Sequence, residues 1–152
     1  MSIGKKDAVK SIFAVLYTLL TAFIAGQFTD TDSEWFVSLE KSPLMPPGIV
    51  FIIVWAVLYM LVAISFALTL VNGGKAFLFM LVLALLSLWC YVFFIKQQPV
   101  EGLILIIVIL ILSIMLFKYA YGYLPAAGYL ILPLCLWLAY AAAINYQTVL
   151  LN

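Results

Sequence analysis

The stretch SPLMPPGIVFIIVWAVLYMLVAISFALTLVNGG, residues 42–74, contains 33 consecutive residues without a charged side chain. A helix needs about 20 apolar residues to cross the hydrocarbon core of a bilayer, so this stretch alone predicts a membrane-spanning helix. Further uncharged intervals lie on both sides of it, at residues 11–28, 76–95, 102–117 and 119–152. The interval 102–117 is the shortest, and it reaches spanning length if Lys118 extends its ammonium group to the headgroup layer.

These intervals predict an all-α fold, a bundle of five transmembrane helices that forms a single domain over residues 1–152. The predicted helices are 9–28, 47–71, 76–96, 100–121 and 125–149, with a lid loop at 29–46. The composition agrees, because 68% of the residues are apolar and 9% are charged, which excludes a water-soluble domain. The net charge is +1 and the chain has no basic run, so we expect no nucleic-acid partner.

The lysines are distributed unequally between the two sides of the predicted bundle. A chain with five spans has its ends on opposite sides of the membrane, and the side of the N-terminus carries more lysines than the other side. Because positive residues favour the cytoplasmic side, this pattern predicts an integral membrane protein with a cytoplasmic N-terminus. The lysines on the N-terminal side are Lys5, Lys6, Lys10, Lys75 and Lys118, and those on the other side are Lys41 and Lys96.

Chemistry that depends on histidine is excluded, because the chain contains none. The commonest metal ligand and general base is therefore missing, and we expect no metal site. Cys90 and Cys135 lie in apolar stretches and are interpreted as small buried hydrophobic residues. Glu101 is interpreted as a solvated acid at a helix start, and the alternative is a buried proton carrier.

Residues 29–46 form the longest connection between predicted helices, and long ordered loops often act as lids or binding elements. Asp32 or Ser33 is expected to cap a short helix, with Glu34 in its first turn and Lys41 in its last turn. The apolar face of this helix comprises Trp35, Phe36 and Leu39, and the prolines that follow it are Pro43, Pro46 and Pro47. These prolines direct the chain stiffly into the next helix. The alternative is an amphipathic segment that lies on the membrane surface.

Aromatic residues recur at helical spacing in three of the predicted helices. The three stripes are Phe51, Trp55, Leu58 and Tyr59; Leu86, Trp89, Cys90, Phe93 and Phe94; and Pro133, Trp137, Ala141 and Asn145. Bulky rings beside the small residues 141–143 favour a slot for a flat ligand, whereas the alternative is that the rings only pack. A buried indole N–H needs an acceptor, which the amide oxygen of Asn145 can supply. Asn145 has its own alternative, an interhelical hydrogen bond that only fixes packing.

Several of these motifs occur together in one known family. They are Trp35, Lys41-Ser42-Pro43, Pro46-Pro47, Phe51, Val54-Trp55, Leu58-Tyr59, Trp89, Phe93-Phe94, and the block from Pro133 through Trp137 to Ala141-Ala142-Ala143-Ile144-Asn145-Tyr146. With this pattern the chain resembles the tryptophan-rich sensory protein, or translocator protein, family from about Trp35 to its C-terminus. The resemblance implies a five-helix bundle in a bacterial cell membrane, often a homodimer, with a pocket that the first loop closes.

The resemblance also implies a ligand and a function. Members of the family bind protoporphyrin IX and aromatic compounds such as isoquinoline carboxamides, and bacterial members are linked to tetrapyrrole regulation. Protoporphyrin IX is thus the expected ligand, and no cofactor is required. Residue by residue, the implied ligand-binding positions are Trp35, Pro47, Phe51, Trp55, Trp89, Phe93, Trp137, Ala141 and Asn145.

Two other activities remain open as alternatives for the same pocket. One is degradation of protoporphyrin IX that depends on light and oxygen, with Trp35 and Trp137 as the catalytic residues. In that case the excited porphyrin supplies most of the chemistry and the protein positions it. The other is transport of the ligand, which is less favoured because the sequence shows neither paired repeats nor a central charge.

The chain departs from the family pattern at several positions. It has Leu86 where the family usually has Asn, Cys90-Tyr91 in place of Ser-Pro, and Leu105 in place of an acid. We therefore expect a less polar pocket than is usual in the family. Leu150 lies where the cholesterol motif of animal members needs a basic residue, so cholesterol is not an expected partner.

Overall fold

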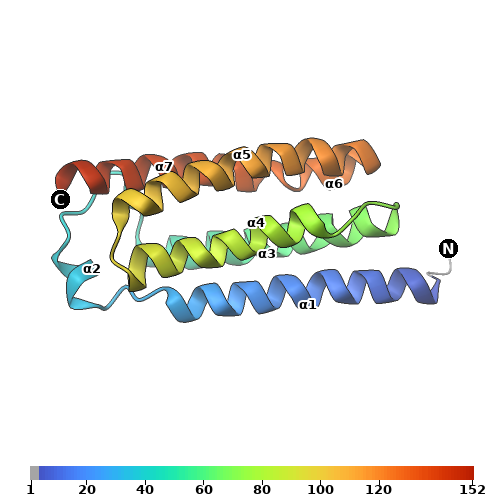
Figure 1. Cartoon of the computed structure of the whole chain (residues 1–152), viewed down its shortest axis with the longest axis horizontal. Coiled ribbons are helices and arrows are strands. Elements are labelled where there is room, and N and C mark those ends of the chain that lie inside the picture. The colour runs from blue at the N-terminus through green and yellow to red at the C-terminus, as the bar shows by residue number, and fades with distance from the viewer. Residues whose placement is uncertain (1–3) are drawn as a thin grey trace.

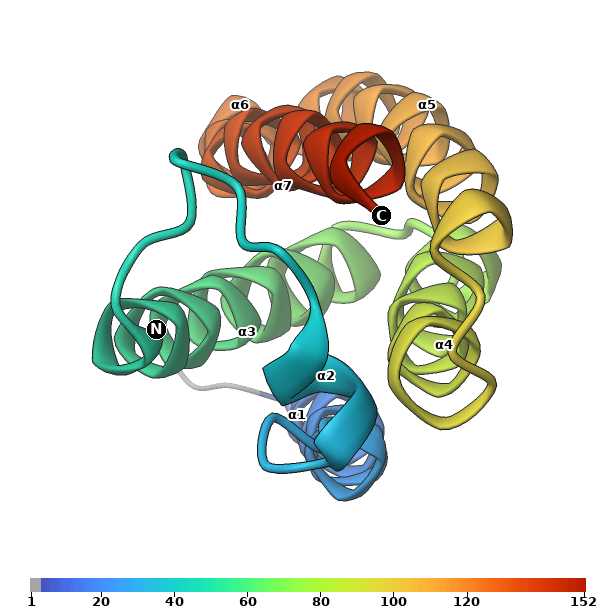
Figure 2. The ribbon, with the colours of Figure 1, turned by 90° about the vertical axis from the view of Figure 1, so that its left-hand side faces the viewer.

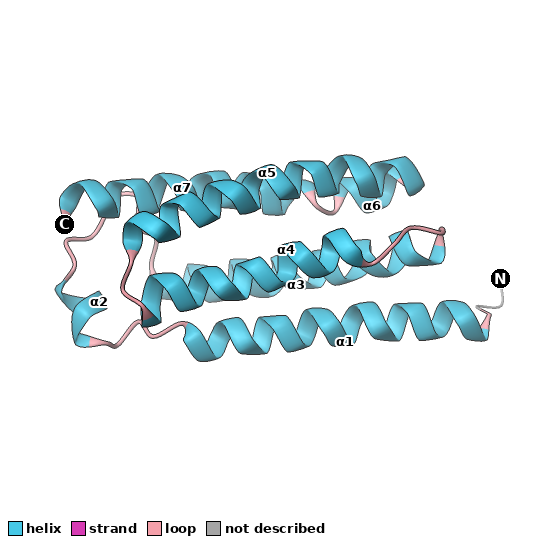
Figure 3. Cartoon of the chain, in the orientation of Figure 1, coloured by secondary structure: helices cyan, strands magenta, loops and turns pink. Residues whose placement is uncertain are grey.

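The computed structural model describes residues 4–152, so residues 1–3 of the predicted domain lie outside the described residues. Its elements are α1 (Lys5–Phe28), α2 (Glu34–Ser38), α3 (Gly48–Val71), α4 (Phe77–Cys90), the π-helix η1 (Tyr91–Ile95), α5 (Pro99–Tyr123), α6 (Pro125–Tyr129) and α7 (Leu132–Leu151). Helices account for most of the described chain, and residues 4–152 contain no strand (Figure 3). The predicted all-α class is confirmed.

Within residues 4–152, five helical segments are long and apolar enough to cross a membrane. They are Lys5–Phe28, Gly48–Val71, Phe77–Ile95, Pro99–Tyr123 and Pro125–Leu151. They run side by side along the length of the molecule, so their connections gather at its two ends (Figure 1). The start of α1 and the α3–α4 and α5–α6 turns lie at one end, whereas α2 and the C-terminus lie at the other. The chain is therefore an integral membrane protein built as a five-helix bundle.

The helices form a ring in which each long helix packs on its neighbours. Helix α1 packs against α3 and α4, and α5 packs against α4 on one side and against α6 and α7 on the other. Figure 2 shows this ring from the end that carries α2. Helix α3 contacts α7 only sparsely, so the seam between α3 and α7 is the loosest part of the ring.

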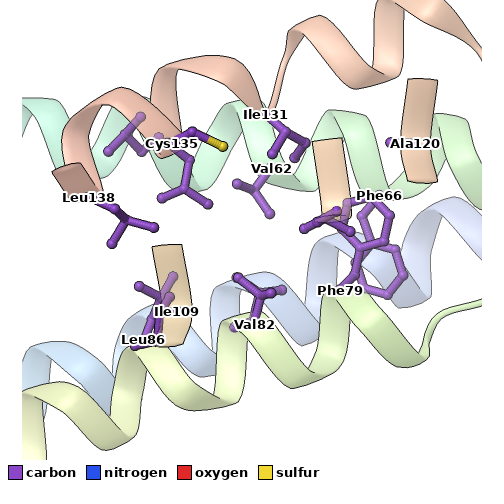
Figure 4. Packing of buried hydrophobic residues seen from close by; sticks show 14 of the residues in the cluster. Val62, Phe66, Phe79, Val82, Leu86, Ile109, Ala120, Ile131, Cys135 and Leu138 are labelled. Atoms are coloured by element: carbon purple, nitrogen blue, oxygen red, sulfur yellow. The ribbon is translucent and has the colours of Figure 1, made fainter. Parts of the chain in front are cut away.

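The core of the bundle is a continuous layer of apolar side chains from α3, α4, α5 and α7 (Figure 4). Toward the end of the bundle that carries the α3–α4 turn, the rings of Phe66 and Phe79 stack nearly parallel, with centroids 4.5 Å apart. Short polar side chains join the helices around this core. The Ser65 hydroxyl donates to the carbonyl of Ala127 at 2.7 Å, and the Ser87 hydroxyl donates to the carbonyl of Thr21 at 2.8 Å. Such bonds matter in lipid, where helix association depends on packing and interhelical hydrogen bonds.

Two of the predicted helices are interrupted. The predicted helix 125–149 is divided after Tyr129, because Pro133 has no N–H to donate into the preceding turn. The chain passes the break through a tight turn in which the N–H of Ile131 donates to the carbonyl of Gly128 at 2.8 Å. The predicted helix 76–96 changes to π geometry over Tyr91–Ile95, a feature that hydrophobic spacing does not reveal.

Residues 29–46, which we call the lid, contain a shorter helix than predicted. The expected cap is present, because the Ser33 hydroxyl accepts the N–H of Phe36 at 3.3 Å. The helix ends at Ser38, so the expectation that Lys41 lies in its last turn is wrong. Lys41 instead folds back from beyond the helix, and its ammonium group donates to the carbonyl of Phe36. It thereby satisfies a helix-end carbonyl, as a residue in the last turn would.

Candidate functional site

The first half of the lid rests on the π-helix through two pairs of aromatic rings. The ring of Trp35 meets Phe93 edge to face with centroids 5.6 Å apart, and the ring of Phe36 meets Phe94 at 5.3 Å. Both phenylalanines are buried although they are consecutive in the sequence. A π-helix turns less per residue than an α-helix, so it can direct two adjacent side chains toward the same neighbour. We call these four residues the lid seat.

The second half of the lid is bound to α7 by hydrogen bonds. The N–H of Glu40 donates to the side-chain oxygen of Asn152 at 2.8 Å, and the Asn152 amide donates back to the carbonyl of Glu40 at 3.1 Å. Ser42 is 3% exposed and is hydrogen-bonded to Gln147. The hydroxyl of Tyr140 donates to the carbonyl of Leu44. We call these contacts of Tyr140, Gln147 and Asn152 the lid latch. The lid therefore lies against the bundle end.

Lys41 places a positive charge on the lid. Its ammonium group lies 3.7 Å from the centroid of the Phe36 ring, a cation–π contact. Desolvation lowers the pKa of Lys41 from its usual value. On the π-helix side, the ammonium of Lys96 lies 5.7 Å from the ring of Tyr91. Each of these lysines therefore covers an aromatic ring near the lid seat.

Beside the lid seat, Trp89 and Asn145 join three helices. The indole N–H of Trp89 on α4 donates to the side-chain oxygen of Asn145 on α7 at 3.3 Å. The amide nitrogen of Asn145 donates to the carbonyl of Pro99, the first residue of α5, at 2.8 Å. Gly102 makes room for this arrangement, since a Cβ there would lie 3.3 Å from the Asn145 oxygen and 3.5 Å from the Trp89 nitrogen.

A second group of rings lies at the seam between α3 and α7. Phe51 meets Trp137 edge to face at 5.5 Å, and Trp137 contacts Tyr140 of the lid latch at 5.3 Å. The buried indole N–H of Trp137, which we call the Trp137 donor, has no acceptor among residues 4–152. Trp137 also lines an open apolar groove of about 450 Å³ along this seam. The groove is lined by Ile53, Val54, Val57, Leu58, Pro133, Leu136, Trp137 and Tyr140.

Comparison with known proteins assigns this bundle to a family. The TspO/MBR family matches the chain over residues 13–151. The chain belongs to the TspO/MBR family. It is 32% identical to the tryptophan-rich protein TspO of Archaeoglobus fulgidus over 153 residues, which cover 96% of this chain and 99% of that protein. It is 30% identical to the uncharacterized membrane protein YtaB of Bacillus subtilis over 90% of each chain, and 29% identical to protein CrtK of Rhodobacter capsulatus over 93% of each.

The predicted ligand-binding residues of this TspO/MBR protein fall into separate groups. Trp35, Phe93, Trp89 and Asn145 form one connected set through ring contacts and a hydrogen bond. Phe51 and Trp137 form a second set at the seam. Trp55 contacts Tyr59 on its own helix, Ala141 is buried in the core, and Pro47 is exposed at the start of α3. That all nine line one ligand pocket stays a prediction.

The two tryptophans that the degradation alternative would use lie in different groups. Trp35 lies on the lid against Phe93, whereas Trp137 lies on α7 against Phe51. A ligand that touched both would have to reach from the lid seat to the α3–α7 seam of this TspO/MBR protein. That activity stays an alternative.

Several residues that organise the site of this TspO/MBR protein were not predicted from the sequence. The lid latch residues Gln147 and Asn152 were missed because single polar residues near a C-terminus carry no distinctive pattern. Phe36 was seen only as part of an apolar helix face. The paired motifs Trp35-Phe36 and Phe93-Phe94 were the available signal, since two adjacent rings on each of two elements can pack as two pairs.

Proposed function

We propose that this chain is a membrane receptor-like protein that binds protoporphyrin IX and other flat aromatic ligands between its helices beneath the lid, and that it acts in tetrapyrrole regulation. The observation that carries the proposal is the Trp137 donor. It is a buried polar group beside aromatic rings and close to the lid latch. Leaving such a donor unsatisfied in an apolar region costs on the order of 1–3 kcal/mol, so a ligand that brings an acceptor recovers that free energy.

The surroundings of the Trp137 donor favour a flat, largely apolar ligand. Phe51 and Tyr140 flank it, and the adjoining open groove of about 450 Å³ is lined almost entirely by apolar and aromatic side chains, as ligand sites commonly are. A porphyrin offers a planar face for stacking and dispersion against indole and phenyl rings. Its two carboxylates favour the lid end of the bundle, where Lys41 supplies a positive charge.

The proposal is tested by titrating the detergent-solubilised protein with protoporphyrin IX and following the absorbance of the porphyrin. We expect the double variant Trp55→Ala, Trp137→Ala to lose most of the affinity, because it removes two of the proposed wall rings. Trp137→Phe keeps a ring and removes only the donor, so it should weaken binding by roughly tenfold. Tyr129→Ala, a ring change on the exposed surface of α6, serves as the control.

If the double variant keeps its helical circular dichroism and binds the porphyrin with unchanged affinity, the assignment of the binding site to the seam between α3 and α7 is wrong. An isoquinoline carboxamide titrated in competition provides a second check. If it displaces the porphyrin, the two ligand classes share one site. If both bind together, the proposed single pocket is wrong.

A further inference from the structure

Asn145 is an unusual residue for a membrane interior, and both ends of its amide are already in use. Its oxygen accepts the Trp89 indole N–H and its nitrogen donates to the carbonyl of Pro99, while only 2% of its surface is exposed. An enclosed amide whose oxygen and nitrogen each already bond another helix has little to offer a ligand. The geometry instead suits a group that holds α4, α5 and α7 in one arrangement.

The hydrogen bond from Trp89 also fixes the plane of its ring. That ring stacks on Phe93, with centroids 5.1 Å apart and an interplanar angle of 20°. The ring of Phe93 in turn makes an edge-to-face contact with the ring of Trp35, which is part of the lid. A chain of direct contacts therefore runs from Asn145 on α7, through two rings, to the helix in the first half of the lid.

We infer that Asn145 is a positioning residue for the lid: by orienting Trp89 it holds Phe93 in the place where α2 docks. Without the hydrogen bond, the Trp89 ring gains rotational freedom and the lid seat loses its fixed geometry. The inference deepens the proposed function, because a displaced α2 opens the covered end of the bundle. Lid position can nevertheless be measured with no ligand present, so the inference does not fall with that function.

The lid is attached at two places, the lid seat and the lid latch, so the expected effect of losing the Asn145 amide is confined to one of them. The lid latch binds Glu40, Ser42 and Leu44 through side chains of α7 and of its C-cap residue Asn152, and none of them touches the Trp89 ring in any described contact. Loss of the Asn145 amide should therefore free α2 while the chain near Leu44 stays in place. A general loosening of the fold would move both halves of the lid together.

The experiment measures distances between pairs of spin labels in the whole chain by double electron–electron resonance, a pulsed electron paramagnetic resonance method. The background carries Cys90→Ala and Cys135→Ala, and cysteines for labelling are introduced in pairs, Val37 with Met60 and Leu44 with Met60. All three label positions are exposed. In Asn145→Leu we expect the Val37–Met60 distance to lengthen and broaden, and the Leu44–Met60 distance to stay as in the parent.

Thr148→Val is the matched control. Thr148 lies on the same helix, is 2% exposed, and donates its hydroxyl to the carbonyl of Ile144 within α7 at 3.0 Å. This variant removes a buried hydrogen bond of α7 that does not reach Trp89, so neither label pair should respond. An equal response of the Val37 pair to Thr148→Val and to Asn145→Leu would overturn the inference.

A double-mutant cycle identifies the contact that carries the effect. Trp89→Phe keeps the stacked ring and removes the indole N–H, so it should shift the Val37 pair in the same direction as Asn145→Leu. Trp89→Phe breaks a hydrogen bond that Asn145→Leu has already removed, together with the bond to Pro99. The double variant should therefore show no larger shift than the stronger single variant. Additive shifts, or a Val37 distance that is unchanged in folded Asn145→Leu, would contradict the inference.

Porphyrin dissociation rates measured in the same variants distinguish a failure of this inference from a failure of the proposed function. If protoporphyrin IX binds, Asn145→Leu should speed its dissociation while Thr148→Val leaves the rate unchanged. If the porphyrin does not bind at all, the proposed function fails, and the label distances still decide whether Asn145 positions the lid.

Discussion

The ring of Phe51 on α3 meets the indole of Trp137 on α7 edge to face, with centroids 5.5 Å apart and planes inclined by 75°. This contact lies on the seam where α3 and α7 otherwise touch sparsely. It brings a second helix to the Trp137 donor, which has no acceptor within the described chain. The tryptophans on α4 and α7 thus differ in kind, because the indole N–H of Trp89 is bonded to Asn145.

This difference predicts unequal costs for two chemically identical substitutions. Trp89→Phe breaks a hydrogen bond and leaves the Asn145 oxygen unpaired, whereas Trp137→Phe removes the Trp137 donor and breaks no described bond. We expect Trp89→Phe to lower the free energy of unfolding by about 1–2 kcal/mol more than Trp137→Phe does. Reversible denaturation in mixed detergent micelles measures both. A larger loss in Trp137→Phe would contradict the assigned hydrogen bonds.

Gly102 predicts a second matched pair of variants on a single helix. A Cβ at Gly102 would lie 3.3 Å from both the Asn145 oxygen and the Phe93 ring, whereas a Cβ at Gly122 of the same helix meets nothing within 4 Å. Gly102→Ala should therefore destabilise the protein by about 1–3 kcal/mol through crowding. Gly122→Ala should be neutral or stabilise by up to about 1 kcal/mol through helix propensity. Thermal unfolding in detergent tests both, and similar shifts in the two variants would count against the close contact at Gly102.

The sequence was sufficient to predict the bundle because charge spacing is a direct consequence of the membrane. Each span must keep charges out of the hydrocarbon, so the intervals between charged residues set the number and approximate bounds of the helices. The Ser33 cap was predictable for a similar reason, since its interaction with Phe36 lies within four residues. Features set by local chemistry or by the solvent are therefore visible in one sequence.

Contacts between distant residues were not predictable in the same way. Asn145 was expected to accept an indole N–H, yet spacing alone does not say which indole, and the structure pairs it with Trp89, 56 residues away. The π-helix Tyr91–Ile95 packs against α1 and α5, and its geometry has no counterpart in the spacing of the apolar residues. The residues that hold the site together were thus harder to predict than the helices that carry them.

The contacts of the lid latch predict that Asn152 slows hydrogen exchange in the lid. Asn152 both accepts from and donates to the backbone of Glu40. Asn152→Ala should therefore speed hydrogen exchange at the Glu40 amide roughly two- to tenfold, the change expected for loss of one hydrogen bond. Exchange followed by mass spectrometry on a lid peptide measures it. Tyr146→Phe, which removes a hydroxyl on the exposed face of α7, is the control, and equal exchange in the two variants would argue against the latch.

The orientation in the membrane yields a final prediction. Lys75 lies in the connection between α3 and α4, at the same end of the bundle as the start of α1, whereas Lys96 follows η1 at the lid end (Figure 1). Because the end with the start of α1 carries five lysines and the lid end carries two, the positive-inside rule predicts that the lid lies on the outer side of the membrane. In a background without native cysteines, Lys96→Cys should react with a membrane-impermeant maleimide on intact cells, and Lys75→Cys should react only after permeabilisation. The reverse pattern would place the lid in the cytoplasm, and labelling of both positions on intact cells would indicate two orientations of the chain.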